Sequence, residues 1–126
     1  MNKDSTGSLA ETLAQFGPLI EADLKATARI PEGSPASYYG MMHYHLGWVD
    51  PSLVPAEGNS GKRLRPVICL LSCQAAGREF RQALPAASAL ELVHNFSLVH
   101  DDIQDGSHLR RGRRAVWDLW GVAHGI

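Results

Sequence analysis

Residues 85–105 read PAASALELVHNFSLVHDDIQD, a run that is apolar on most faces of a helix. We predict one long helix from Pro85 to Gln104, roughly 30 Å in length at about 1.5 Å per residue. We expect Gly106 to end it, because glycine is a common residue just past the end of a helix. A helix that is apolar nearly all round needs other helices packed around it. The stretch therefore favours a helical bundle.

Helical spacing continues on the N-terminal side of this stretch. An apolar stripe with the period of a helix runs through residues 8–29, and we expect Gly17-Pro18 to kink that helix or split it in two. The stripe consists of Leu9, Leu13, Phe16, Ile20 and Leu24. A short helix is predicted over residues 36–46, between segments rich in proline and glycine.

Two further helices follow from the positions of proline, glycine and apolar residues. Pro66 suits the first turn of an apolar helix that runs to about Ala76, because a first-turn N–H has no partner within the helix. Gly77 is a suitable end signal for it, and residues 116–120 begin a last helix. No segment alternates with the two-residue period of a half-buried strand, so we predict an all-α fold.

The composition is that of an ordinary globular protein. The 126 residues suffice for one small domain, 44% of them are hydrophobic, 20% are charged, and the formal net charge is −1. A dedicated nucleic-acid binder carries a strong basic excess, so nucleic acid is not expected as a partner. No run of 18 apolar residues exists, so no membrane span is expected. Residues 1–6 lack the apolar core of a signal peptide, and a cytoplasmic location is the expectation.

A polar stripe crosses the otherwise apolar long helix. Its members, spaced three or four residues apart and hence on one face, are Glu91, His94, Leu98, Asp101 and Asp105. Burying such a stripe is costly unless it lines a polar cavity. Acids at a helix C-terminus oppose the helix dipole, so their placement there by chance is disfavoured. Asp101 and Asp105 lie one turn apart with Asp102 beside them. They suit Mg²⁺, which takes one or two carboxylates together with phosphate oxygens and water.

Two groups of cations flank these acids in the sequence. Lys62 and Arg65 come just before and at the start of the helix that contains Pro66, where free N–H groups and the helix dipole favour an anion. A diphosphate pocket is one interpretation and an exposed basic turn is the other; the P-loop pattern is not matched. Residues 110–114 read RRGRR, and arginine suits bidentate phosphate contact. A solvated loop or a nucleic-acid patch remains the alternative for this run.

The cysteines and the other histidines are interpreted as structural. Cys69 and Cys73 lie four residues apart in an apolar run, and the sequence offers no further ligands close by, so we expect buried thiols rather than a metal site. The histidines that we place in the same group are His43, His45, His100, His108 and His124.

In three ordered motifs the chain resembles the trans-isoprenyl diphosphate synthases, also called the polyprenyl synthetase family. The motifs are GKRLRP at residues 61–66, ELVHNFSLVHDDIQD at residues 91–105 and RRG at residues 110–112. The resemblance implies a large helical bundle that encloses the substrate cavity and usually assembles as a homodimer. We therefore expect residues 1–126 to form one truncated domain, the N-terminal part of the isoprenoid synthase fold.

The resemblance also implies a reaction, the head-to-tail condensation of isopentenyl diphosphate with an allylic diphosphate. It implies that Asp101 and Asp105, with Asp102 beside them, bind the allylic diphosphate through Mg²⁺, and that Arg110 contacts this diphosphate. The residues implied to hold isopentenyl diphosphate are Lys62, Arg65, His94 and Arg111. Phe96, five residues before Asp101, matches a position that limits product length and hints at short to medium products.

The chain departs from the family pattern in its acidic motifs. The family has a second aspartate-rich motif in its C-terminal half, and these 126 residues contain one acidic triplet. The sequence stops at Gly125-Ile126 without a polar tail, so we expect a truncated chain that does not turn over substrate alone. Two other functions stay open: a non-catalytic partner or regulatory subunit of a prenyl synthase, and an unrelated phosphate or nucleic-acid binder that uses the arginine run.

Overall fold

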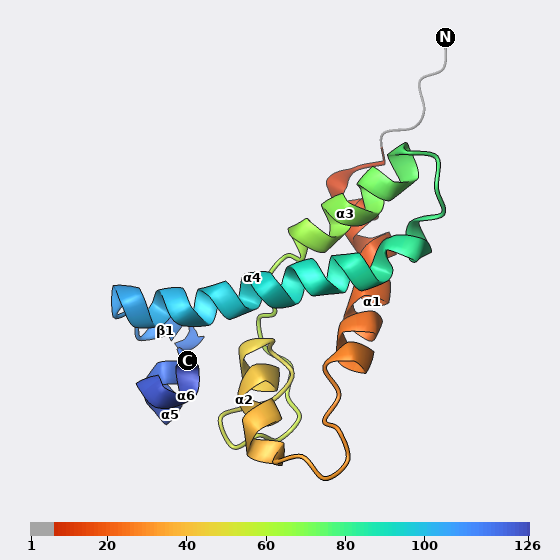
Figure 1. Cartoon of the computed structure of the whole chain (residues 1–126). Coiled ribbons are helices and arrows are strands. Elements are labelled where there is room, and N and C mark those ends of the chain that lie inside the picture. The colour runs from red at the N-terminus through yellow and green to blue at the C-terminus, as the bar shows by residue number, and fades with distance from the viewer. Residues whose placement is uncertain (1–6) are drawn as a thin grey trace. The chain divides into compact units, whose positions relative to one another are not determined.

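The computed structural model of the chain describes residues 7–126 (Figure 1). The expectation drawn from residues 1–6, that they form no signal peptide, lies outside the described residues. The described part divides into two compact units. The first unit holds the described residues up to Thr27 together with Arg63–Leu90, and the second unit holds Ala28–Lys62 together with Glu91–Ile126.

The regular structure of the described residues is helical apart from one hairpin of two short strands. This confirms the predicted all-α class. No helix within residues 7–126 is long and apolar enough to cross a membrane.

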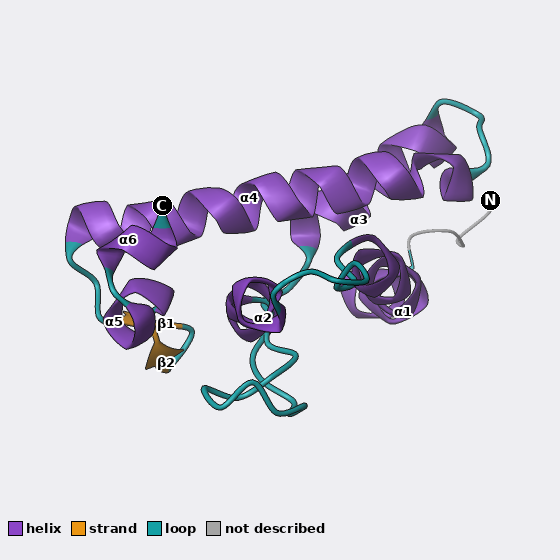
Figure 2. Ribbon diagram, turned by 60° about the horizontal axis from the view of Figure 1, so that its bottom comes forward, coloured by secondary structure: helices purple, strands orange, loops and turns teal. Residues whose placement is uncertain are grey.

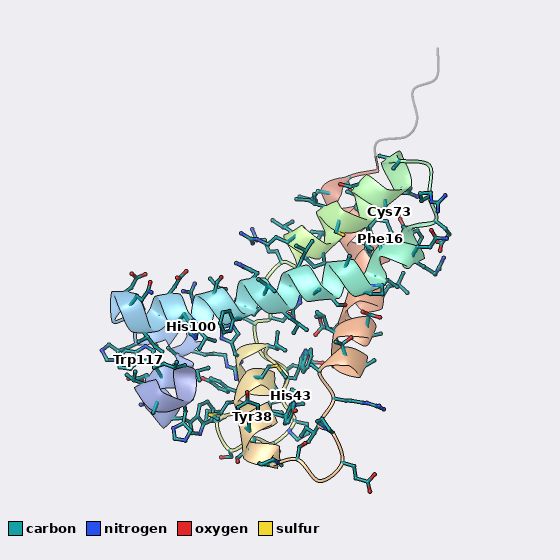
Figure 3. All side chains as sticks on the ribbon, viewed as in Figure 1. Phe16, Tyr38, His43, Cys73, His100 and Trp117 are labelled. Atoms are coloured by element: carbon teal, nitrogen blue, oxygen red, sulfur yellow. The ribbon has the colours of Figure 1, made fainter. Side chains whose placement is uncertain are left out.

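In the first unit, α1 (Leu9–Thr27) packs against α3 (Leu64–Ala75), which in turn contacts the 3-10 helix η1 (Phe80–Ala83). The apolar side chains that α1 buries at helical spacing are Phe16, Ile20 and Leu24. The ring of Phe16, marked in Figure 3, lies 4.9 Å from that of Phe80. The predicted stripe is therefore confirmed for these three residues.

Of the two outcomes expected at Gly17-Pro18, a kink or a split, the split is wrong, because α1 is a single helix with Pro18 inside it. The kink stays a prediction. Proline removes one backbone hydrogen bond from a helix and usually kinks or breaks it. Here buried side chains lie on both sides of the proline, with Phe16 before it and Ile20 after it on the same apolar face. Their packing holds the two halves of α1 together.

A part-buried ion pair fixes the start of α3 to α1 within the first unit. Arg63, the residue before α3, has left-handed backbone with φ of 53°, and its side chain is only 6% exposed. Its Nε donates to Oε2 of Glu21 at 3.2 Å. Pro66 lies in the first turn of α3, as predicted. Arg63 is thus a structural residue within the GKRLRP motif.

Glycines end α3 and α4 (Leu84–Asp105) where the sequence predicted. Gly77 and Gly106 have φ of +75° and +64°, a region that glycine adopts without strain. At the end of α4 the N–H of Gly106 donates to the carbonyl of Ile103, and the N–H of Ser107 donates to that of Asp102. This pair of bonds is the Schellman motif, which satisfies carbonyls of the last helical turn.

The second unit contains α2 (Ala36–His45), the part of α4 after Leu90, a hairpin, α5 (Val116–Trp120) and α6 (Val122–Gly125). The short helix predicted over residues 36–46 and the last helix predicted from residue 116 are both confirmed. Figure 2 shows the hairpin in orange.

This hairpin lies inside the arginine run and was not expected from the sequence. β1 (Leu109–Arg110) pairs antiparallel with β2 (Arg113–Arg114). Arg111 and Gly112 form the loop with φ of 53° and 77°, and positive φ at both loop residues is typical of the type I′ turn. Strands of two residues are too short to show an alternating pattern, which explains why none was found.

Tyr44 of α2 attaches the hairpin to the rest of the second unit. Its hydroxyl donates to the carbonyl of Arg114 at 2.7 Å, and the guanidinium of Arg113 lies 4.0 Å from its ring centroid. Arg113 also donates to the carbonyls of Tyr44 and Val49 at 2.9 and 2.8 Å. Trp120 meets the tyrosine ring edge-on at 5.2 Å. Arg113 therefore has structural partners.

Candidate functional site

A row of buried polar side chains follows one face of α4. Glu91, Asn95 and Asp102, all in the second unit, are 3%, 4% and 2% exposed. Their spacing of four and seven residues puts them on the same side at about 100° per residue. Ser88 continues the row into the first unit, where its hydroxyl donates to the carboxylate of Asp23. A buried polar group is costly without a hydrogen-bond partner. The residues that bond to this row therefore show which side chains the fold brings together at the site.

Asp102 is the buried member of the acidic triplet, and its partner is Arg110 of β1. The arginine Nη2 donates to Oδ1 at 2.6 Å, and its Nε donates to Oδ1 and Oδ2 at 3.1 and 3.2 Å. These hydrogen bonds raise the pKa of Arg110 above its ordinary value, and the charges of Asp102, Asp101 and Asp105 add to the effect. Such charge-assisted pairs are the strong hydrogen bonds of proteins. Asp102 thereby locks the hairpin to the last turn of α4.

Asp101 and Asp105 are both exposed on that last turn. Residues four apart are neighbours on a helix surface, so the two carboxylates are available to one ligand while Asp102 is committed to Arg110. Within residues 7–126 no group of three or more His, Cys, Asp or Glu side chains is arranged to hold a metal ion. Two exposed carboxylates nonetheless fit Mg²⁺, which completes its shell with substrate phosphate oxygens and water rather than with a protein cage.

Arg111, in the turn of the hairpin, belongs to a second polar network. Its Nη2 donates to Oδ1 of Asn95 at 3.3 Å, and Nε2 of His45 in α2 lies 3.0 Å from the same oxygen. The amide nitrogen of Asn95 donates to Oε1 and the carbonyl of Glu91 at 3.0 and 2.8 Å. Arginine only donates, so Oδ1 is an acceptor, and His45 carries its proton on Nε2.

The pKa of His45 is lowered from 6.5 to about 4, mainly by burial and to a smaller extent by the charge of Arg111. The hydrogen bond to Asn95 and the charge of Asp102 act in the opposite direction and are smaller than the burial effect. The imidazole is therefore neutral at pH 7. A neutral ring next to Arg111 adds no positive charge to repel it.

Gly61 places Arg111 close to Lys62. A Cβ built on Gly61 would lie 3.1 Å from Cζ and Nη2 of Arg111, so the guanidinium rests on the bare backbone of the glycine. Lys62 follows directly and is exposed. The guanidinium of Arg111 thus lies against the backbone of the residue that precedes Lys62.

Arg65 and His94 complete that expected set, and they lie in different units. Arg65 is exposed in the first turn of α3, in the first unit. His94 is half-buried on α4, in the second unit, and its carbonyl accepts a hydrogen bond from the hydroxyl of Ser97 at 2.7 Å. Their part in diphosphate binding stays a prediction.

The outer arginines of the run do not join Arg110 and Arg111. Arg114 donates from Nε to Oδ2 of Asp118 at 2.6 Å, and Nδ1 of His108 lies 2.7 Å from Oδ1 of the same residue. Hydrogen bonds from His108 and Arg114 lower the pKa of Asp118. Since Arg113 and Arg114 have structural partners, the run is not a solvated basic loop.

An apolar cavity of about 430 Å³ lies between α2 and α4 in the second unit. Tyr39 and Met42 line it from α2, and Phe96 and Val99 line it from α4. Phe96 is 60% exposed, and its ring meets that of His100, marked in Figure 3, at 4.2 Å. The position expected to limit product length therefore forms part of an apolar wall.

The match to a family model decides the relationship of this chain to known proteins. The model described as polyprenyl synthetase matches residues 52–126. The chain belongs to the polyprenyl synthetase family. Family relatives include the (2E,6E)-farnesyl diphosphate synthase of Mycobacterium tuberculosis, which is 48% identical over 66% of this chain and 23% of the relative. The dimethylallyltranstransferase of Fischerella ambigua is 36% identical over 94% of this chain and 31% of the relative.

Solved structures of the family share the fold. A polyprenyl synthetase from Streptomyces coelicolor A3(2) superposes with a TM-score of 0.73 and 36% identity, over 94% of this chain and 33% of that one. The geranylgeranyl pyrophosphate synthetase of Geoglobus acetivorans gives 0.76 and 37%, over 90% and 33%. The described fold is therefore the all-α isoprenoid synthase fold. The chain spans about a quarter to a third of the length of these relatives.

Asn95 and the network role of His45 were not predicted from the sequence. The spacing of Asn95 from Glu91 and Asp102 was a usable signal, since it places all three on one helical face. His45 gave no such signal, because only the tertiary fold brings α2 to α4 in the second unit.

Proposed function

We propose that the chain carries diphosphate-binding and metal-binding parts of a head-to-tail prenyltransferase, which condenses isopentenyl diphosphate with an allylic diphosphate. One observation supports this most strongly. Asp101 and Asp105 are exposed on a helix turn whose third acid, Asp102, is locked to Arg110. Acids that are free for a metal thus lie next to a cation that is fixed in place. The relatives include proteins named farnesyl and geranylgeranyl diphosphate synthases, and these names agree with this reaction class.

In this proposal Asp101 and Asp105 hold Mg²⁺ and Arg110 contacts the allylic diphosphate. The ion, when bound, supplies Lewis-acid stabilisation of the charge that develops on a departing diphosphate. Arg110 adds a preorganised positive charge, because Asp102 fixes the direction of its guanidinium before substrate arrives.

The second substrate, isopentenyl diphosphate, is held by Lys62, Arg65, His94 and Arg111. Orientation matters here because the double bond of this substrate must meet the allylic carbon at close range. The apolar cavity beside Phe96 accommodates the hydrocarbon chain and keeps water from the cationic centre. Phe96 limits the length of the product.

The same reasoning extends to the whole chain. We propose that residues 1–126 act as one isoprenoid synthase-like domain of a cytoplasmic protein that assembles as a homodimer. Because one acidic triplet is present, residues 1–126 alone are not expected to turn over substrate. An assay with radiolabelled isopentenyl diphosphate and an allylic diphosphate tests this, and robust product from the chain alone would contradict it.

Calorimetric titration with dimethylallyl diphosphate tests the proposed metal site. We expect binding that requires Mg²⁺ and that weakens at least tenfold in Asp101→Ala. Glu32→Ala removes an exposed carboxylate elsewhere in the second unit and is the matched control, expected to bind as the parent does. Binding that is independent of Mg²⁺, or equal in the two variants, would overturn the proposal. DNA binding with a steep salt dependence would favour the nucleic-acid alternative instead.

A non-catalytic subunit of a prenyl synthase remains the second candidate, because the chain spans less than a third of its curated relatives. It shares the expected diphosphate binding with the first candidate. The two are separated by adding the chain to an active family member. A regulatory subunit changes the rate of that enzyme, and a catalytic fragment leaves it unchanged.

A further inference from the structure

His45 is the buried histidine of the second unit, 9% exposed at the end of α2. Its Nε2–H donates to Oδ1 of Asn95, and the same oxygen accepts from Nη2 of Arg111. The three side chains therefore form a relay from α2 through α4 to the hairpin turn. The direction of each bond is fixed, because Arg111 only donates and the amide nitrogen of Asn95 already donates to Glu91.

Arg111 needs these hydrogen bonds because both its backbone and its side chain adopt conformations that are costly to hold. It is a non-glycine residue with φ of 53°, in a region that side chains with a Cβ rarely adopt. Its long side chain has many rotamers, and holding one of them costs conformational entropy. Residues kept in such conformations need surroundings that over-determine them, and they cluster at functional sites.

Contacts on two sides help to place the guanidinium of Arg111. On one side, the absence of a Cβ at Gly61 lets it approach the backbone directly before Lys62. On the other side, Asn95 accepts its Nη2–H. Asn95 is itself oriented by Glu91 at one end of its amide and by His45 at the other.

We propose that His45 is a positioning residue for the isopentenyl diphosphate site, which it serves by orienting Asn95 so that the amide oxygen holds Arg111 beside Lys62. This inference rests on the proposed function for the role of Arg111, and on the network alone for the placement of Arg111. The neutral Nε2–H of His45 is the group that orients Asn95. A charged ring at this place would repel the arginine that it helps to hold.

Three variants separate this role from simple packing. His45→Gln keeps an N–H donor near the position of Nε2, whereas His45→Leu removes the donor and fills similar space. His43→Leu is the matched control. It removes another imidazole of α2, one whose Nε2 is bonded to the carbonyl of Ala28 at 2.6 Å and not to Asn95.

The first measurement needs no ligand. Solvent exchange of the Nη2 protons of Arg111, which include the donor to Asn95, is followed by NMR in the full chain. We expect about fivefold faster exchange in His45→Leu, the size of one lost hydrogen bond, and rates within twofold of the parent in His45→Gln and His43→Leu. Equal rates in His45→Leu and the parent, or equally fast exchange in His45→Gln and His45→Leu, would overturn the positioning role.

The second measurement is the affinity for isopentenyl diphosphate by calorimetry. We expect about fivefold weaker binding in His45→Leu, recovery in His45→Gln, and unchanged affinity for dimethylallyl diphosphate in both. If the parent chain binds neither diphosphate while Arg111 exchange responds as expected, the proposed function fails and the placement of Arg111 stands. If the parent binds isopentenyl diphosphate and His45→Leu binds it equally well, the positioning role fails and the proposed function stands.

A fourth variant, Asn95→Asp, tests the same proposal if His45→Leu does not fold. Asn95→Asp puts a carboxylate in contact with Arg111 and in competition with the diphosphate. We expect slower exchange of the Arg111 Nη2 protons together with weaker binding of isopentenyl diphosphate. Faster exchange in this variant would show that Asn95 does not hold Arg111, and would overturn the proposal.

Discussion

Acidification should destabilise the second unit through His45. The pKa of this imidazole is about 4 in the folded chain, mainly because of burial, against 6.5 for an ordinary histidine. As the pH falls below 6.5, the unfolded chain binds a proton that the folded chain does not, so the free energy of unfolding decreases with it. Arg111 and Arg110 lower this pKa, while Asn95 and Asp102 raise it.

The size of the effect follows from the two pKa values. Between pH 7.5 and pH 5 the linkage relation gives a loss of about 2 kcal/mol, which grows to roughly 3 kcal/mol near pH 4. Above pH 7 the contribution is constant, because His45 is neutral in both states. A loss of about 2 kcal/mol is a substantial part of the stability of a small domain.

Urea unfolding at pH 7.5, 6 and 5 measures this loss, and His45→Gln isolates it. Carboxylates elsewhere titrate alike in the parent and the variant, so the difference between the two pH profiles belongs to His45. We expect the parent to lose about 2 kcal/mol more than His45→Gln between pH 7.5 and pH 5. Parallel profiles, or an NMR titration that gives His45 a pKa near 6.5, would refute the buried, neutral histidine.

Three further predictions concern the same region. Asp102→Asn removes the buried partner of Arg110 and should lower the free energy of unfolding by about 3 kcal/mol. Asp101→Asn, at an exposed position, should change this free energy by less than about 0.5 kcal/mol. Equal losses of the two variants in urea unfolding would contradict the assigned burial. Gly61→Ala should cost about 1–2 kcal/mol, through strain at φ of +81° and contact with Arg111, and should weaken isopentenyl diphosphate binding in calorimetry; an unchanged affinity would contradict the contact. Gly106→Ala should cost about 1 kcal/mol from backbone strain alone, because the position that its Cβ would take has no atom within 4 Å, and a loss of diphosphate binding would show a further role.

Local signals in the sequence predicted most of the helices. The helix ends at Gly77 and Gly106 were predictable, because glycine favours the left-handed residue that completes a Schellman motif. The continuity of α1 through Pro18 was not predictable, because it depends on tertiary packing of Phe16 and Ile20. The hairpin was hidden for a different reason, since its strands have two residues each and its loop begins with an arginine in place of the usual asparagine or glycine.

The sequence predicted which residues belong to the candidate site but not which of them form contacts with one another. Spacing identified the acidic triplet, and it assigned Asp101 and Asp105 to the ligand side, where the structure leaves them exposed. It did not reveal that Asp102 pairs with Arg110, because that contact depends on the hairpin. The part played by His45 depends on a contact across about fifty positions of chain, which no local pattern encodes.

The division of labour between Asp101 and Asp102 has a consequence for genetics. If Asp101 holds Mg²⁺ as proposed, a screen for loss of Mg²⁺-dependent diphosphate binding would score substitutions at either position alike. Second-site suppressors should tell them apart: stabilising changes elsewhere in the polypeptide are expected to rescue a damaged Asp102, and none should restore a missing Asp101. On the proposed role of Asp101, substitutions at two adjacent codons would thus fail for two unrelated reasons, loss of folding stability at one and loss of the proposed metal contact at the other.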